Sequence, residues 1–125
     1  MFTTLAWRVC RVADLLAAER NGPWLGLPDA TRAVEGDPGT AAEALDALDE
    51  ACGIWRGILG RTTEESLGLP VGRRGVERDR RSLVLHVLDE LIHHGTEAAL
   101  MRDLYAASRL WSRRAGPLCS DAVRS

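Results

Sequence analysis

The 125-residue sequence lacks an excess of basic side chains, since 16 lysine or arginine residues face 18 aspartate or glutamate residues and the formal net charge is −2. Nucleic-acid-binding proteins usually carry a basic excess on one face, so this balance argues against a nucleic-acid partner. Glu77 and Asp79 interrupt the arginines between residues 73 and 81, which favours a solvated loop over a phosphate site. No uninterrupted apolar run approaches the roughly 20 residues of a membrane-spanning helix.

Cysteine is equally scarce. The chain has three, Cys10, Cys52 and Cys119, which are odd in number, widely spaced and free of any CxxC pair. This pattern fits reduced thiols better than a disulfide framework. The first residues also lack the basic segment and apolar run of a signal peptide. We therefore expect a soluble, cytoplasmic protein.

Strand patterns are absent too, and three helical segments dominate the chain. We expect helices over residues 3–20, over 40–59, and from residue 80 or 82 to between 107 and 113. Two loops of roughly twenty residues join them, and loops of that length often lie beside functional sites. The sequence thus predicts one all-α domain over residues 1–115, with two long crossover loops, and a flexible tail over 116–125.

Local signals mark the boundaries of these helices. Asn21-Gly22-Pro23 is expected to end the first helix, and Thr40-Ala-Ala-Glu43 fits a capping box at the start of the second. Trp24 and Leu25 are expected to anchor the first loop. Gly95 lies within the third helix, where glycine costs about 1 kcal/mol relative to alanine. We expect a close neighbouring backbone there, or a need for space beside His94.

All three histidines of the chain lie between residues 86 and 94 of the third predicted helix. At 3.6 residues per turn, His86, Glu90, His94 and Glu97 share one face of that helix. Metal sites in helical bundles are built from Glu and His side chains one turn apart that project inward. This stripe is therefore the candidate site of the chain.

Helix geometry limits which residues of the stripe can share one ion. His86 and His94 are about 12 Å apart along the axis, whereas metal–ligand bonds are only about 2.0–2.2 Å long. One ion can bind His86 with Glu90, or Glu90 with His94, and His93 with Glu97 forms a further pair. A third ligand must come from another helix. The competing interpretation is a solvated helix face, where such pairs contribute only a few tenths of a kcal/mol.

Several segments of the chain resemble DinB-like proteins. The third predicted helix resembles their last helix through residues 83–86 (LVLH), 90–95 (ELIHHG) and 97–105 (EAALMRDLY). Residues 3–8 and 12–14 resemble their second helix, and residues 40–56 resemble their third. The resemblance covers most of the chain, and its last-helix motif is the most specific part.

This superfamily includes the YfiT-like proteins and a mycothiol-dependent maleylpyruvate isomerase. The resemblance implies a four-helix bundle with long crossovers and a divalent metal, zinc or nickel, held by three residues. A histidine on the second helix and two residues four apart on the last helix are the implied ligands. Here Glu90 and His94 match the last-helix pair, and His86 would be adjacent or support them. Relatives use the metal to activate a small thiol such as mycothiol, which fits a metal lowering the pKa of a ligand.

Two departures from the family pattern bear on function. Arg11 stands where the second-helix histidine is expected, and a guanidinium has no lone pair to give a metal. The sequence also begins where the second bundle helix should start, so the first helix is expected to be missing, either naturally or through a misassigned start.

Two functions follow from these features. The first is a metal-dependent thiol transferase or isomerase with Glu90 and His94 as ligands. The second, which we favour, is a degenerate, non-catalytic bundle in which Arg11 pairs with Glu90. Three helices without a fourth also expose an apolar face, for which a homodimer is the economical partner.

Overall fold

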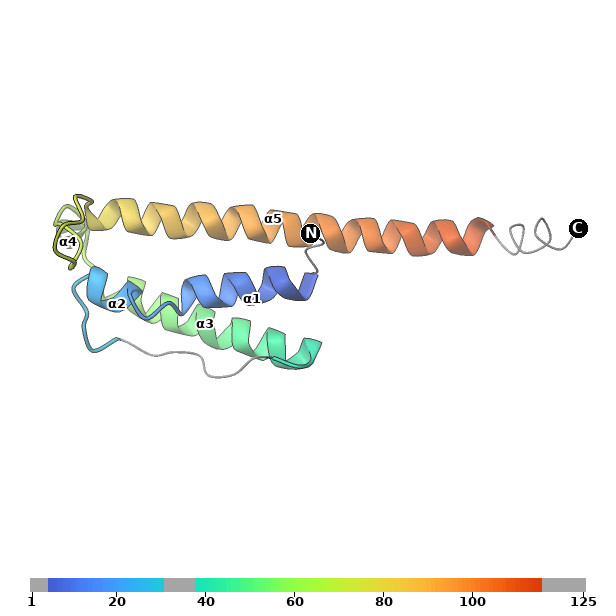
Figure 1. Cartoon of the computed structure of the whole chain (residues 1–125), viewed down its shortest axis with the longest axis horizontal. Coiled ribbons are helices and arrows are strands. Elements are labelled where there is room, and N and C mark those ends of the chain that lie inside the picture. The colour runs from blue at the N-terminus through green and yellow to red at the C-terminus, as the bar shows by residue number, and fades with distance from the viewer. Residues whose placement is uncertain (1–4, 31–37, 116–125) are drawn as a thin grey trace, which may run out of the picture.

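The computed structural model describes residues 5–30 and 38–115, and it confirms the expected all-α architecture (Figure 1). Three long helices, α1 (Leu5–Leu16), α3 (Ala41–Arg61) and α5 (Arg80–Ala115), form the body of the molecule. Two single-turn helices, α2 (Asn21–Trp24) and α4 (Glu64–Leu67), interrupt the long connections. Across residues 5–30 and 38–115, no helix combines the length and the apolar composition of a membrane-spanning segment.

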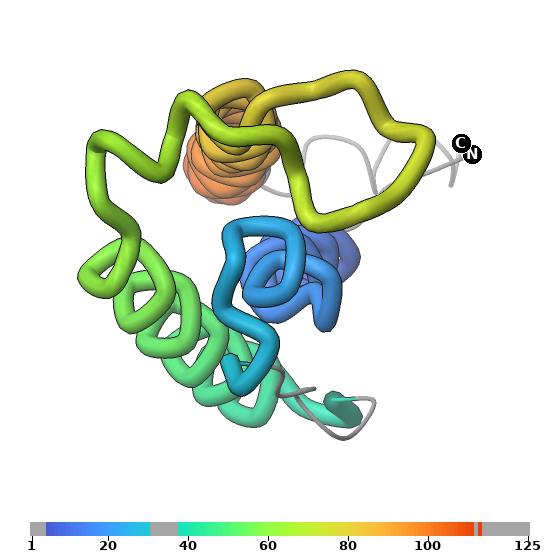
Figure 2. Tube along the Cα trace, turned by 90° about the vertical axis from the view of Figure 1, so that its left-hand side faces the viewer, coloured from blue at the N-terminus to red at the C-terminus, as the bar shows by residue number. Residues whose placement is uncertain are grey.

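α1 is the central helix of the bundle. It packs against both α3 and α5, whereas α3 and α5 contact each other far less (Figure 2). α1 and α3 run in the same direction and α5 runs antiparallel to both, so the connection through α4 crosses one end of the bundle. The buried core draws on all three helices and on the two connections: Val12, Ala13, Leu16, Ala17, Leu25, Ala51, Trp55, Ile58, Val71, Leu83 and Val87.

The first helix is shorter than the sequence suggested, because α1 ends at Leu16 rather than near residue 20. Asn21 explains the difference. Its side chain is fully buried, and Nδ2 donates hydrogen bonds to the carbonyl oxygens of Leu15 at 2.9 Å and Leu16 at 3.4 Å. Those carbonyls have no partner further along the helix, so Asn21 caps the end of α1. The expected anchor Leu25 is buried, and Trp24 packs half-buried against the core.

The capping box of α3 is confirmed. Thr40 Oγ1 accepts a hydrogen bond from the backbone N–H of Glu43 at 3.2 Å, and the Glu43 carboxylate accepts one from the Thr40 N–H at 3.1 Å. These reciprocal bonds satisfy two donors that the first turn would otherwise leave unpaired. The helix ends at Arg61, close to the predicted end at residue 59.

Arg80 joins the two connections at one end of the bundle. Its Nε donates to the carbonyl oxygen of Pro70 at 3.1 Å, and its Nη1 donates to that of Leu25 at 3.3 Å. The guanidinium lies against Gly26, which has φ +80°, so a side chain there would be strained and would collide with Arg80. This contact fixes the start of α5, the helix that carries the candidate site.

The expectation for Gly95 was wrong. A Cβ placed on Gly95 would have no neighbour within 4 Å, so among the described residues no backbone approaches it closely. Gly95 is exposed to solvent, whereas His94 beside it points into the bundle. The glycine therefore does not make space for His94.

The N-terminus of α5 provides a test by pH. Hydrogen bonds from the hydroxyl and then the backbone N–H of Ser82, the latter at 2.8 Å, lower the pKa of Asp79. Because this pKa is lowered on folding, the cap stabilises the protein above the unfolded pKa of the carboxyl group. That stabilisation is lost as the pH falls through the lowered pKa of the folded state. We expect the melting temperature of the wild type to fall more between pH 6 and pH 3 than that of Asp79→Asn. The measurement is thermal unfolding followed by circular dichroism.

Asp46→Asn removes a carboxylate from an exposed position of α3 and serves as the matched control. It should keep the acid sensitivity of the wild type. If Asp79→Asn and Asp46→Asn follow the same curve, the capping interaction does not contribute to acid sensitivity.

Candidate functional site

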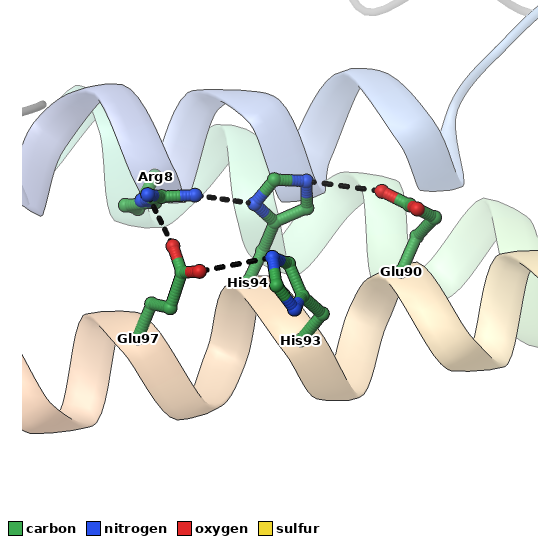
Figure 3. Close-up of polar contacts among 5 residues, drawn as sticks. All are labelled: Arg8, Glu90, His93, His94 and Glu97. Atoms are coloured by element: carbon green, nitrogen blue, oxygen red, sulfur yellow. Dashed lines mark hydrogen bonds and ion pairs between the residues drawn. The ribbon is translucent and has the colours of Figure 1, made fainter.

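The candidate site lies between the first half of α1 and the middle of α5 (Figure 3). α5 supplies Glu90, His93, His94 and Glu97 over two turns, and α1 supplies Arg8 from the facing side. The two helices are antiparallel and packed together, which brings residues 86 positions apart in the sequence into contact. The site is therefore a polar cluster where two core helices meet.

The Arg8 guanidinium bridges two residues of α5. Its Nη1 lies 2.9 Å from His94 Nδ1, and its Nη2 forms an ion pair with Glu97 Oε2. The other Glu97 oxygen, Oε1, lies 2.9 Å from His93 Nε2, and His94 Nε2 lies 3.2 Å from Glu90 Oε2. The five side chains form one continuous chain of contacts, from His93 through Glu97, Arg8 and His94 to Glu90 (Figure 3).

The contacts of His94 fix the position of its proton. A guanidinium can only donate hydrogen bonds, so His94 Nδ1 must accept one from Arg8 and carries no proton. The proton of the neutral ring is then on Nε2, which donates to Glu90 Oε2. Each ring nitrogen thus has a protein partner, and the lone pair that could bind a metal points at a cation.

Burial is uneven across this cluster. The His94 side chain is 11% exposed and that of Arg8 is 15% exposed, whereas Glu97 and Glu90 are 32% and 36% exposed. Trp7 lies over the same region, with its ring edge-on to that of His94 at a centroid distance of 6.3 Å. The Arg8–His94 contact therefore lies deepest and is the best shielded from water, which strengthens it relative to a surface contact.

The structure places Arg8, rather than Arg11, against His94. Arg11 is exposed, and its guanidinium lies 5.6 Å from the centre of the Trp7 ring. This arrangement differs from the expected pairing of Arg11 with Glu90 by one helical turn. Glu90 and His94, the pair implied as metal ligands, do lie together. His86 is half-buried two turns before His94, outside the cluster of Figure 3.

Sequence reasoning missed Arg8, although a signal for it was present. Arg8 precedes the buried residues Val12 and Leu16 by four and eight positions, so it lies on the same face of α1. Arg11 lies off that face. The apolar periodicity of α1 was therefore a better guide to the residue facing α5 than the alignment of a single motif.

The side chains of this site do not fit a divalent metal as they stand. Among the described residues, no group of three or more His, Cys, Asp or Glu side chains could hold an ion. Protein metal sites generally draw at least three ligands from such side chains. The guanidinium of Arg8 lies beside His94 and Glu97, where it would repel a cation.

Comparison with known proteins places these features in a family. The family model described as the DinB superfamily matches residues 3–98, more than half of the chain. Neither the curated proteins nor the solved structures include a significant match. The matched region contains α1, α3 and the whole polar cluster, and it ends within α5. The fold, the last-helix motif and this match together establish that the chain belongs to the DinB superfamily.

Proposed function

We propose that this protein is a non-catalytic member of the DinB superfamily in which Arg8 takes the place of the metal ion. The observation that carries the proposal is the bridge from the Arg8 guanidinium to His94 Nδ1 and Glu97 Oε2. A divalent ion would supply positive charge between the same ring nitrogen and carboxylate. The guanidinium supplies that charge from the chain itself.

Electrostatics supports this replacement. A carboxylate one-third exposed between two helices loses part of its hydration, and a partner cation offsets that loss. Arginine is charged at every physiological pH and can contact two acceptors at once. The charge of Glu97 is therefore offset without an exchangeable ion, and the function of the cluster on this proposal is to hold α1 against α5.

This proposal leaves no position for a small thiol to be activated. Thiol activation in the family relies on a metal that lowers the pKa of a bound thiol. With His94 Nδ1 occupied by Arg8, the remaining pair of Glu90 and His94 offers two ligands from one helix. We therefore infer that neither zinc nor nickel is a resident cofactor and that no mycothiol-type reaction occurs.

Calorimetric titration of the chelator-treated protein with zinc and with nickel tests the proposal. We expect no stoichiometric binding above that of a Glu90→Ala/His94→Ala control. Circular dichroism should first establish that the control is folded. One equivalent of metal bound by the wild type and lost in the control would refute the proposal and favour the metal-dependent thiol transferase instead.

A further inference from the structure

The second half of α5 extends beyond the rest of the bundle. α5 has 36 residues, and its C-terminal part projects past the ends of α1 and α3 (Figure 1). The family match ends at residue 98, so residues 99–115 of this helix lie outside the matched region. An isolated helix of this length is marginally stable in water. A partner packed along the projecting part would therefore stabilise it.

Apolar side chains follow the solvent-facing side of α5 along most of its length. Leu85, Leu88 and Ile92 step by three and four residues and are 58%, 40% and 65% exposed. The projecting part continues the pattern with large exposed side chains. Together they form what we call the α5 seam: Leu85, Leu88, Ile92, Leu100, Leu104, Leu110 and Trp111. The seam lies away from Val87 and His94, which face the bundle.

Four of the seven seam residues form a self-complementary pattern. Leu85 and Trp111 lie at equal distances on either side of residue 98, and so do Ile92 and Leu104. Two copies of α5 packed antiparallel about a two-fold axis near residue 98 would bring Leu85 against Trp111 and Ile92 against Leu104. A two-fold interface requires this kind of pattern, since the same surface must fit itself.

Two further observations favour a second copy of this chain over another partner. Gly95 is exposed near the centre of the seam with open space around it, so a second helix could approach closely there. This would explain a mid-helix glycine that the bundle itself does not need. In the same register His93 lies opposite Asp103 of the second copy, and both side chains are more than 60% exposed. An imidazole N–H of His93 can donate a hydrogen bond to that carboxylate.

The surface available is sufficient for a stable pair. At roughly 100 Å² of exposed area for each side chain, the seven seam residues offer about 700 Å² per copy. Standard interfaces bury about 800 Å² on each partner, so neighbouring polar residues need add little. We propose that this protein forms a homodimer through antiparallel pairing of the α5 seams. The proposal assigns the face and the register of a dimer and is independent of the metal site.

Sedimentation equilibrium of the full chain at micromolar concentration tests the dimer. We expect a dimer for the wild type, and we expect Ile92→Lys to raise its dissociation constant by about 100-fold or more, because each copy buries a charge. Leu45→Lys is the matched control, since Leu45 is 59% exposed on α3, away from the seam. A monomeric wild type, or dissociation by Leu45→Lys without an effect of Ile92→Lys, would overturn the proposal.

Disulfide trapping tests the register in a background whose native cysteines are serine. A mixture of Ile92→Cys and Leu104→Cys chains should cross-link efficiently, whereas Ile92→Cys alone should not. The two copies of residue 92 lie about 18 Å apart in the antiparallel arrangement, well beyond disulfide reach. Efficient self-linking of Ile92→Cys would contradict the antiparallel pairing. Both substituted positions are exposed, so loss of folding is not expected to obscure the result.

Discussion

Replacing Arg8 with histidine is expected to create a zinc site in this protein. The new imidazole would stand near His94 Nδ1 and Glu97 Oε2, the two atoms that the guanidinium now contacts. Removing the cation also frees the His94 lone pair. Three ligands from two helices meet the requirement for a zinc site with an open fourth position. We expect Arg8→His to bind one equivalent of zinc at least about 100-fold more tightly than the wild type, or about 2.7 kcal/mol.

Calorimetry measures this affinity, and the zinc-dependent rise in melting temperature provides a second readout, because a ligand that binds only the folded state stabilises it. Arg11→His is the matched control. It makes the same chemical change one turn away, at the exposed position where the family resemblance implied the third ligand. It should bind no more zinc than the wild type.

Adding His94→Ala to Arg8→His should abolish the new affinity. If Arg11→His binds zinc as tightly as Arg8→His, the position of the lost ligand is not the one that the structure indicates. Comparing the two variants therefore tells whether the lost ligand position is residue 8, as the structure indicates, or residue 11, as the sequence motif implied.

Replacing Arg8 with methionine is expected to destabilise the protein by about 1–3 kcal/mol. Methionine preserves much of the side-chain volume, so the effect reports lost polar contacts rather than a cavity. Glu97 would keep only its contact with His93, and His94 Nδ1 would lose its donor. Urea unfolding followed by circular dichroism measures the change, at one protein concentration for all variants.

A double-mutant cycle isolates the ion pair itself. Because Glu97→Gln removes the charge that Arg8 neutralises, Arg8→Met should cost less in that background, with a coupling of about 1 kcal/mol. Arg61→Met is the control. Arg61 pairs with Asp29 at 3.1 Å, but these side chains are 51% and 68% exposed, so the loss should be below about 0.5 kcal/mol. Equal losses for Arg8→Met and Arg61→Met would show that the buried bridge contributes no special stability.

Features encoded by adjacent residues could be predicted from the sequence. The capping box at Thr40 and Glu43 is an example, because both of its hydrogen bonds lie within four residues. The pairing of Glu90 with His94 is another, since helix geometry alone brings them together. The end of α1 was harder to predict from the sequence. Asn21 marked a break correctly, but its side chain ends the helix several residues earlier by reaching back to Leu15 and Leu16.

Features that depend on how two helices align were not predictable from a motif. Whether Arg8 or Arg11 faces α5 depends on the rotation and axial position of α1, which the whole apolar face determines. The role of Gly95 was also misjudged, because a glycine within a helix does not reveal whether the open space beside it lies inside or outside the bundle. The length of α5 exceeded the expectation because no glycine or proline occurs between Gly95 and Gly116.

The central position of α1 has a consequence for how the chain assembles during synthesis. With twelve residues, α1 is too short to be a stable helix alone, and α5, one of its two packing partners, is made after the other described helices. Contacts across such separations form slowly, because a long loop must close before any contact stabilises it. The N-terminal segment therefore leaves the ribosome well before its place in the bundle exists. The buried Arg8–His94 contact can form only after α5 has emerged.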